Sequence, residues 1–141
     1  MWRSLLIFLV TLLAIGCAPE PGVGPTASAD ASVRKLQHAY EHRQSDLQVE
    51  GQGVVSRILP DDTKGSKHQR FILMLSSGQT LLVAHNIDLA PRLEGLSEGD
   101  VVGFFGEYEW NDKGGVIHWT HHDPAGRHVD GWLRYRERRY Q

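Results

Sequence analysis

Glycines divide the middle of this chain into short segments of alternating apolar and polar residues, and this pattern limits the folds it can adopt. Most of the 15 glycines in the 141-residue chain lie between Gly51 and Gly131. Alternation with a period of two is typical of strands, and glycines mark turns, bulges and sharp bends. Such a density of glycines favours a small, tightly curved barrel over a flat sandwich.

The alternation predicts five strands, the first of them long and bent at Gly51 and Gly53. A non-strand connection, residues 87–100, separates the third strand from the fourth. An apolar stripe of period 3.6 predicts one helix over residues 32–46. The predicted strands are residues 49–59, 68–75, 79–86, 101–110 and 115–122. This order resembles the OB-fold, so we expect a mainly β fold, a small five-stranded OB-like barrel with one N-terminal helix.

The chain begins with a positively charged head and an apolar run, residues 5–15, that is too short to span a bilayer comfortably. The run ends in Ala14-Ile15-Gly16-Cys17, which resembles the lipobox of bacterial lipoproteins. We therefore predict a signal peptide over 1–16, lipidation of Cys17, a flexible tether over 17–31 and a folded domain over 32–141. An ordinary secretory signal or an uncleaved anchor is the alternative.

The lipobox resemblance implies export to the bacterial cell envelope and attachment to a membrane through a lipid anchor. Ala18, in place of aspartate, follows the cysteine, so we expect an outer-membrane lipoprotein that faces the periplasm. Acylation of Cys17, the one cysteine of the chain, excludes cysteine catalysis, cysteine metal ligation and disulfides from the mature protein.

Three runs carry a second resemblance: His68-Gln69-Arg70-Phe71, residues 85–92 from His85 to Arg92, and residues 118–124 from His118 to Pro124. They resemble an uncharacterised family of small exported bacterial proteins, a domain of unknown function. The resemblance covers most of residues 49–141. It implies an exported, OB-like domain and brings no activity with it.

The two predicted hairpins bring polar residues together, but each allows two registers. In the first hairpin one register sets Arg70 opposite His85, and the other sets His68 opposite Asn86. In the second, His118 lies opposite either Tyr108 or Glu107. We expect the binding site at one end of the barrel. Its predicted binding residues are His68, Arg70, His85, Asn86, Asp88, Arg92, Glu107, His118 and Trp119.

Residues 118–128 contain the densest group of possible metal ligands. We predict His121, His122, Asp123 and His128 as candidates for a divalent metal such as zinc. In an extended strand His118 and His122 are about 13 Å apart, so they cannot share one ion. Structural histidines at a barrel end are the alternative, and no cofactor is certain.

The C-terminal segment reverses the charge of the chain. Residues 127–141 carry five arginines against Asp130 and Glu137, whereas residues 46–123 carry six basic and twelve acidic residues. Arginines alternating with aromatic residues can bind single-stranded nucleic acid. We prefer an aromatic face that docks on the barrel, with arginines that pair with its carboxylates or stay solvated, and we do not expect nucleic acid as a partner.

These patterns support an envelope-anchored, non-catalytic binding module with a His/Arg/Asp-rich polar site for a small ligand or an envelope component. The alternative is a metal-dependent hydrolase, a phosphodiesterase or nuclease-like enzyme, that uses the same cluster with Arg70 or Arg92 stabilising phosphate. A third hypothesis is a structural protein whose histidines respond to pH.

Overall fold

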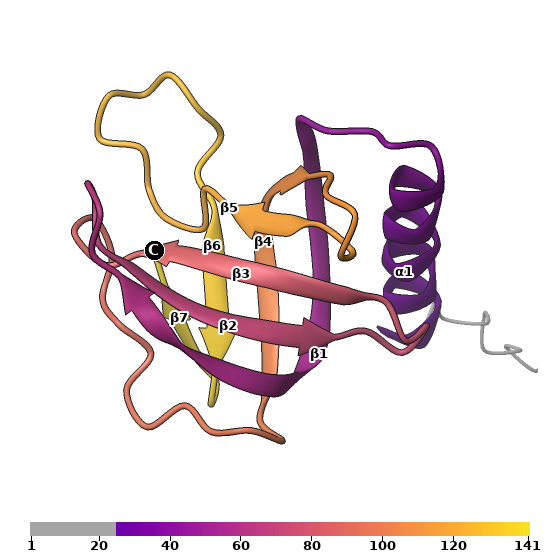
Figure 1. Cartoon of the computed structure of the whole chain (residues 1–141), viewed down its shortest axis with the longest axis horizontal. Coiled ribbons are helices and arrows are strands. Elements are labelled where there is room, and N and C mark those ends of the chain that lie inside the picture. Colours follow the sequence, from indigo (N-terminus) through magenta and orange to yellow (C-terminus); the bar gives the residue numbers. More distant parts are fainter. Residues whose placement is uncertain (1–24) are drawn as a thin grey trace, which may run out of the picture.

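A computed structural model describes residues 25–141 as one helix and seven strands, which confirms the mainly β class. The predicted signal peptide and the predicted lipidation site, Cys17, lie outside the described residues. No helix among residues 25–141 is long and apolar enough to cross a membrane. The elements, drawn in Figure 1, are α1 (Pro25–Glu41), β1 (Leu47–Asp62), β2 (His68–Met74), β3 (Thr80–Asn86), β4 (Val101–Glu109), β5 (Val116–His118), β6 (Trp132–Tyr135) and β7 (Arg138–Tyr140).

Five of the strands form a ring. β1 pairs with β4 along its first half and with β2 along its second, and Val54 is paired on both sides. β2 pairs with β3, β3 runs parallel to β5, and β5 returns to β4, which closes the ring. β1 can bend between its partners because Gly53 has no side chain: a Cβ there would lie 2.9 Å from the carbonyl oxygen of Met74.

The inside of the ring is the hydrophobic core, and alternation along each strand fills it. On β4, for example, Phe104 and Tyr108 are fully buried, whereas Glu107 and Glu109 lie on the outer face. α1 adds Leu36 and Ala39 to the same core. Figure 1 shows the helix beside the turn that joins β2 and β3. Inward and outward positions therefore follow the period of two that the sequence predicts.

Three elements differ from their predicted extents. α1 begins at Pro25, inside the segment predicted as a tether, and ends at Glu41. β5 is only three residues long, because Trp119 takes a left-handed conformation (φ 52°) that ends the strand. The C-terminal segment forms the hairpin β6–β7, and β6 pairs with β4. Its Leu133 and Tyr135 are buried in the core, so the predicted docking of this segment is confirmed.

The structure selects one register in each hairpin. His68 lies opposite Asn86, and Glu107 lies opposite His118. In the second hairpin the side-chain oxygen of Asn111 accepts hydrogen bonds from the backbone N–H groups of Lys113 and Gly115, at 2.8 and 3.0 Å. Gly114 and Gly115 both have positive φ, 117° and 113°, which a residue with a side chain rarely adopts. This turn aligns Glu107 with His118.

Candidate functional site

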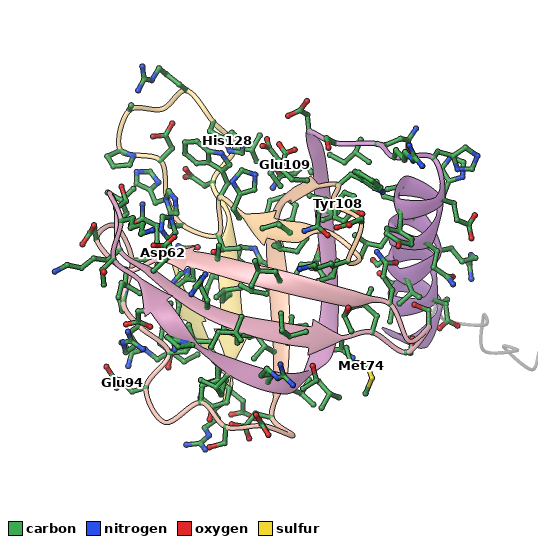
Figure 2. All side chains as sticks on the ribbon, viewed as in Figure 1. Asp62, Met74, Glu94, Tyr108, Glu109 and His128 are labelled. Carbon is green, nitrogen blue, oxygen red and sulfur yellow. The ribbon has the colours of Figure 1, made fainter. Side chains whose placement is uncertain are left out.

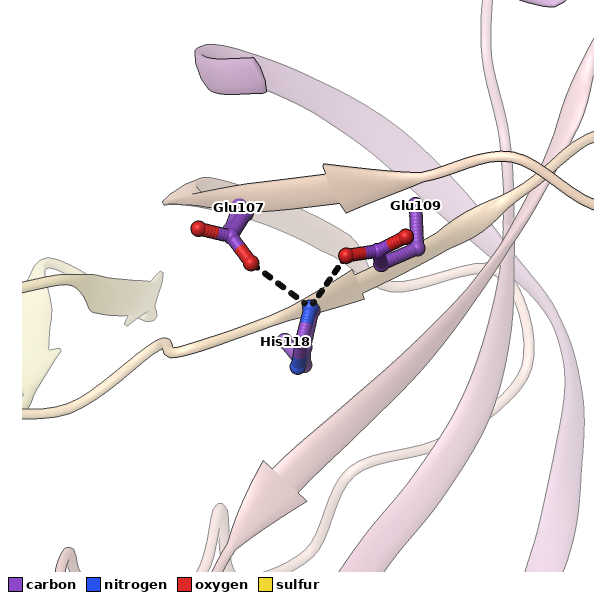
Figure 3. A group of neighbouring side chains, drawn as sticks. All are labelled: Glu107, Glu109 and His118. Atoms are coloured by element: carbon purple, nitrogen blue, oxygen red, sulfur yellow. Dashed lines mark ion pairs between the residues drawn. The ribbon is translucent and has the colours of Figure 1, made fainter. Parts of the chain in front are cut away.

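Glu107, Glu109 and His118 form a group that could hold a metal ion, which we call the metal group. The two carboxylates are two residues apart on β4 and therefore share its outer face, and His118 ends β5 beside them. One ligand atom from each residue lies within 4.8 Å of the others. Figure 3 shows the imidazole pointing between the two carboxylates.

The Nε2 atom of His118 is buried in this group without a hydrogen-bond partner among the described residues. It lies 3.3 Å from Glu107 Oε1 and 3.8 Å from Glu109 Oε1. A bare nitrogen lone pair beside two carboxylates is repulsive, and a buried polar atom without a partner is costly. A cation between the three side chains, either a proton on Nε2 or a metal ion, would remove both penalties.

His128 extends the group from the loop between β5 and β6. Its Nε2 donates to Glu107 Oε2 at 2.7 Å, and its Nδ1 donates to the carbonyl oxygen of Val129 at 2.8 Å. Burial lowers the pKa of His128, but the hydrogen bonds to Glu107 and Val129 and the charges of Glu107 and Asp123 outweigh it and raise the pKa above its usual value. The Trp119 ring stacks on the imidazole, with centroids 4.1 Å apart. Because both ring nitrogens face oxygen acceptors, these contacts favour the protonated imidazole of His128 beside Glu107.

The predicted metal set of His121, His122, Asp123 and His128 is not brought together as one ligand group. Asp123 instead organises the loop: its carboxylate accepts hydrogen bonds from the backbone N–H groups of Ala125, Arg127 and His128, and the bonds from Ala125 and Arg127 in particular lower its pKa. His122 bonds Asp130 at 2.6 Å. Two of the four predicted ligands thus hold the loop that carries His128.

A small pocket of about 200 Å³ adjoins the group on the outer face of the ring. It is lined by His68, Ala84, Asn86, Leu89, His118, Trp119 and His121. His68 and His121 each donate a hydrogen bond from Nδ1 to a backbone carbonyl oxygen, that of Ser66 and that of His122, both at 2.8 Å. Their Nε2 atoms are left as acceptors in the neutral ring, the state in which imidazole binds ligands with donors or metal ions.

His85 lies inside the ring and not in this pocket. The fully buried imidazole donates from Nε2 to the carbonyl oxygen of Pro91 at 3.1 Å, and its Nδ1 accepts from the Thr120 hydroxyl at 2.8 Å. Burial lowers the pKa of His85 to about 4. The residue is thus a neutral, hydrogen-bonded member of the core near the site, and its position continues the inward phase of Leu81 and Val83 on β3.

The buried His85 is expected to make the fold sensitive to acid. In the unfolded chain the imidazole takes up a proton near pH 6.5, but in the folded chain only near pH 4. The stability it contributes is therefore complete above about pH 6.5 and is lost as the pH falls towards 4, a change of about 3 kcal/mol. Chemical denaturation at several pH values should show a shallower acid dependence for His85→Gln than for the native chain. Equal slopes would contradict this assignment.

The predicted arginines are engaged away from the metal group. Arg70 donates from Nε to the carbonyl oxygen of Pro60 at 3.0 Å, and Arg92 forms an ion pair with Asp61. Asp88 accepts a hydrogen bond from the backbone N–H of Lys67 at 2.8 Å and so links the start of β2 to the connection after β3. These three residues hold the loops at one end of the ring.

Comparison with known protein families identifies the chain at the level of family only. Residues 23–141 match the family described as "Protein of unknown function (DUF3465)". The chain belongs to the DUF3465 family. This confirms the predicted membership of an uncharacterised family. No curated protein matches this DUF3465 chain.

Glu109 is the one member of this candidate metal group that the sequence did not single out as a site residue. The sequence pattern indicates its orientation, because Glu107 and Glu109 alternate with inward residues and so project from one face of β4. The two carboxylates become candidate metal ligands only because His118 lies beside them, and that position depends on the register between β4 and β5. Figure 2 shows Glu109 and His128 at the same end of the molecule.

Proposed function

We propose that the chain is an envelope-anchored, non-catalytic binding module that holds a divalent metal ion such as Zn²⁺ through Glu107, Glu109 and His118. The observation that carries the proposal is the buried Nε2 of His118, which lies between two carboxylates and has no hydrogen-bond partner within residues 25–141. A divalent ion there would accept the lone pair and neutralise both negative charges. Imidazole nitrogen and carboxylate oxygen are ordinary zinc ligands.

Three protein ligands leave a coordination position for a further group. The adjoining pocket of about 200 Å³ has polar walls from His68, Asn86 and His121 and an aromatic wall from Trp119. These features support a small ligand or a part of an envelope component as the bound partner. The hydrogen bond of His128 to Glu107 would orient that carboxylate, as groups around metal ligands commonly do.

The finer features of fold and location belong to the same proposal. The ring order β1-β2-β3-β5-β4, with β3 and β5 parallel, supports an OB-like barrel. The lipobox-like sequence before Cys17 supports attachment to the outer membrane, facing the periplasm. A mass measurement on the exported protein tests the anchor: cleavage before Cys17 with added acyl chains is expected, and an unmodified Cys17 would reject it.

A metal titration tests the binding site directly. The purified protein is expected to bind one Zn²⁺ per chain with a dissociation constant of about 1 μM or lower, Mn²⁺ more weakly and Ca²⁺ weakest, because a nitrogen ligand favours transition metals. Calorimetry on the metal-stripped protein measures stoichiometry and affinity together. Sub-stoichiometric binding of all three ions would overturn the proposal.

The alternative, a metal-dependent hydrolase, has no specific observation in its favour among the described residues. Such an enzyme needs a positive group with free donors near the metal to stabilise phosphate charge, and both ring nitrogens of His128 already donate to Glu107 and Val129. Arg70 and Arg92, the residues considered for that role, bind Pro60 and Asp61 instead. The binding module is therefore the function that the geometry supports best.

A further inference from the structure

Three exposed apolar side chains form a row on the outer face of the ring, away from the metal group. Val54 of β1 is paired both with Met74 of β2 and with Val101 of β4, so the three lie side by side across three strands. The exposed fraction is 39% for Val54, 46% for Met74 and 55% for Val101. Figure 2 shows Met74 pointing away from the sheet, far from His128. A contiguous apolar row with a polar rim is typical of an interaction surface.

The row borders a groove at the beginning of α1. The groove has a volume of about 570 Å³, and Ala29 and Val33 of the helix form its other wall. α1 begins at Pro25. The chain from Cys17 to Pro25 spans at most about 29 Å even when fully extended. A lipid on Cys17 would therefore keep this end of the domain close to the membrane surface.

Arginines continue the same face. Arg134 of β6 is paired with Gly103 of β4, and with Arg136 it lines a second groove of about 430 Å³. Val101 lines both grooves, so the apolar row and the arginines form one surface.

These arginines have no carboxylate partner in the part of the chain that the structure describes. They lie over aromatic rings instead. Arg134 and Arg139 are 5.7 and 4.7 Å from the centroid of Trp132, and Arg136 is 4.8 Å from that of Tyr135. Guanidinium groups on aromatic faces keep their charge and their donors for an external anion.

We propose that the face formed by Val54, Met74, Val101, Arg134 and Arg136 docks on an anionic lipid surface. Arginines are attracted to anionic headgroups, and apolar side chains beside them enter the boundary between headgroups and acyl chains. Asp30 and Glu137 also line the two grooves and balance Arg134 and Arg136 in charge. The net positive charge of this face therefore comes from Arg139, which is paired with Arg134. A nucleic acid would use the arginines and aromatic rings but would leave the apolar row in water.

This inference concerns a face other than the metal group and shares with the proposed function only the lipid anchor. Vesicle binding by a chain that carries Cys17→Ser tests the face without the anchor. Metal binding and acylation are measured separately. Failure of one proposal is therefore distinguishable from failure of the other.

The test uses the full chain with Cys17→Ser and Met74→Cys, labelled at residue 74 with an environment-sensitive fluorophore. With vesicles that contain phosphatidylglycerol, the fluorophore is expected to shift to the blue and to be quenched by headgroup nitroxides. With phosphatidylcholine alone the effect should be about tenfold weaker, and high salt should reverse it. A label at Arg127→Cys, in the loop at the other end of the molecule, should stay unquenched in a chain with the same N-terminal segment.

Charge-reversal variants distinguish binding through this face from an attraction that depends only on the net charge of the protein. Arg134→Glu with Arg136→Glu is expected to lower association at residue 74 by about tenfold or more. Lys64→Glu with Arg127→Glu changes the net charge equally and should alter it by less than about twofold. Equal quenching at residues 74 and 127, or no loss in the Arg134/Arg136 variant, would overturn the proposal. Tighter binding of a single-stranded oligonucleotide that releases the chain from the vesicles would also overturn it.

Discussion

Glu107→Gln is expected to weaken Zn²⁺ binding by about 100-fold or more. Changing a group that merely orients a metal ligand costs 10- to 100-fold in affinity, and Glu107 would be a ligand itself. The substitution keeps the size of the side chain but removes its charge, which also abolishes the charge-assisted hydrogen bond from His128, 2.7 Å long in the native chain. Competition against a chromophoric zinc chelator measures the loss.

Glu94→Gln provides the matched control for this experiment. Glu94 is an exposed glutamate in the connection between β3 and β4 and is not a member of the metal group. Figure 2 shows it far from Glu109 and His128. The control is expected to bind Zn²⁺ within about twofold of the native protein. If Glu107→Gln also bound Zn²⁺ within that range, the metal would lie elsewhere.

Gly106→Ala is expected to destabilise the fold by about 3 kcal/mol, which is near the upper end for an overpacked core. A Cβ on Gly106 would lie 2.5 Å from the carbonyl oxygen of His118 and 3.0 Å from Cγ2 of Thr120. The first of these is a backbone atom of β5 and cannot move without the strand. Because His118 itself would shift, Gly106→Ala should also weaken metal binding. Urea denaturation and the zinc titration measure the two effects.

Gly103→Ala on the same strand is the matched control. A Cβ there would meet the Arg134 side chain at 3.5 Å, an ordinary contact. The free energy of unfolding is expected to change by no more than about 0.5 kcal/mol. Similar losses in both variants would show that general glycine-to-alanine strain in β4, and not the approach of β5, explains the effect.

The strands were predictable because alternation is a local property. The predicted range 101–110 agrees with β4 to within a residue, and 68–75 and 79–86 agree similarly with β2 and β3. The short β5 was not predicted, because its end depends on the left-handed conformation of Trp119. The strands β6 and β7 were read only as a docked segment, although Leu133 and Tyr135 alternate with outward residues. Arginines at the outward positions obscured that period.

Burial was harder to predict for polar residues. His85 and Gln69 were read as strand-end polar groups or passed over, yet both occupy inward positions. Gln69 is satisfied there by the backbone of Leu93, which accepts from its Nε2 at 3.1 Å and donates to its Oε1 at 2.9 Å. The alternation along β2 and β3 indicates an inward position for both residues. Their hydrogen-bond partners are Pro91 and Leu93 in the connection between β3 and β4 and Thr120 after β5, and the sequence does not reveal the paths of these two segments.

The sequence by itself determined the mainly β class, the turns and the outward projection of Glu107 and Glu109, because each depends on neighbours within a few residues. Only the tertiary structure decided that His118 faces Glu107 and that His128 binds it. Either hairpin loop satisfies the local pattern, and a change of one residue in register moves His118 opposite Tyr108. The contact of His128 with Glu107 depends on an irregular loop, whose path is set by N–H groups bonded to Asp123 and by the close fit of Gly131 against the carbonyl oxygens of Trp119 and Phe105.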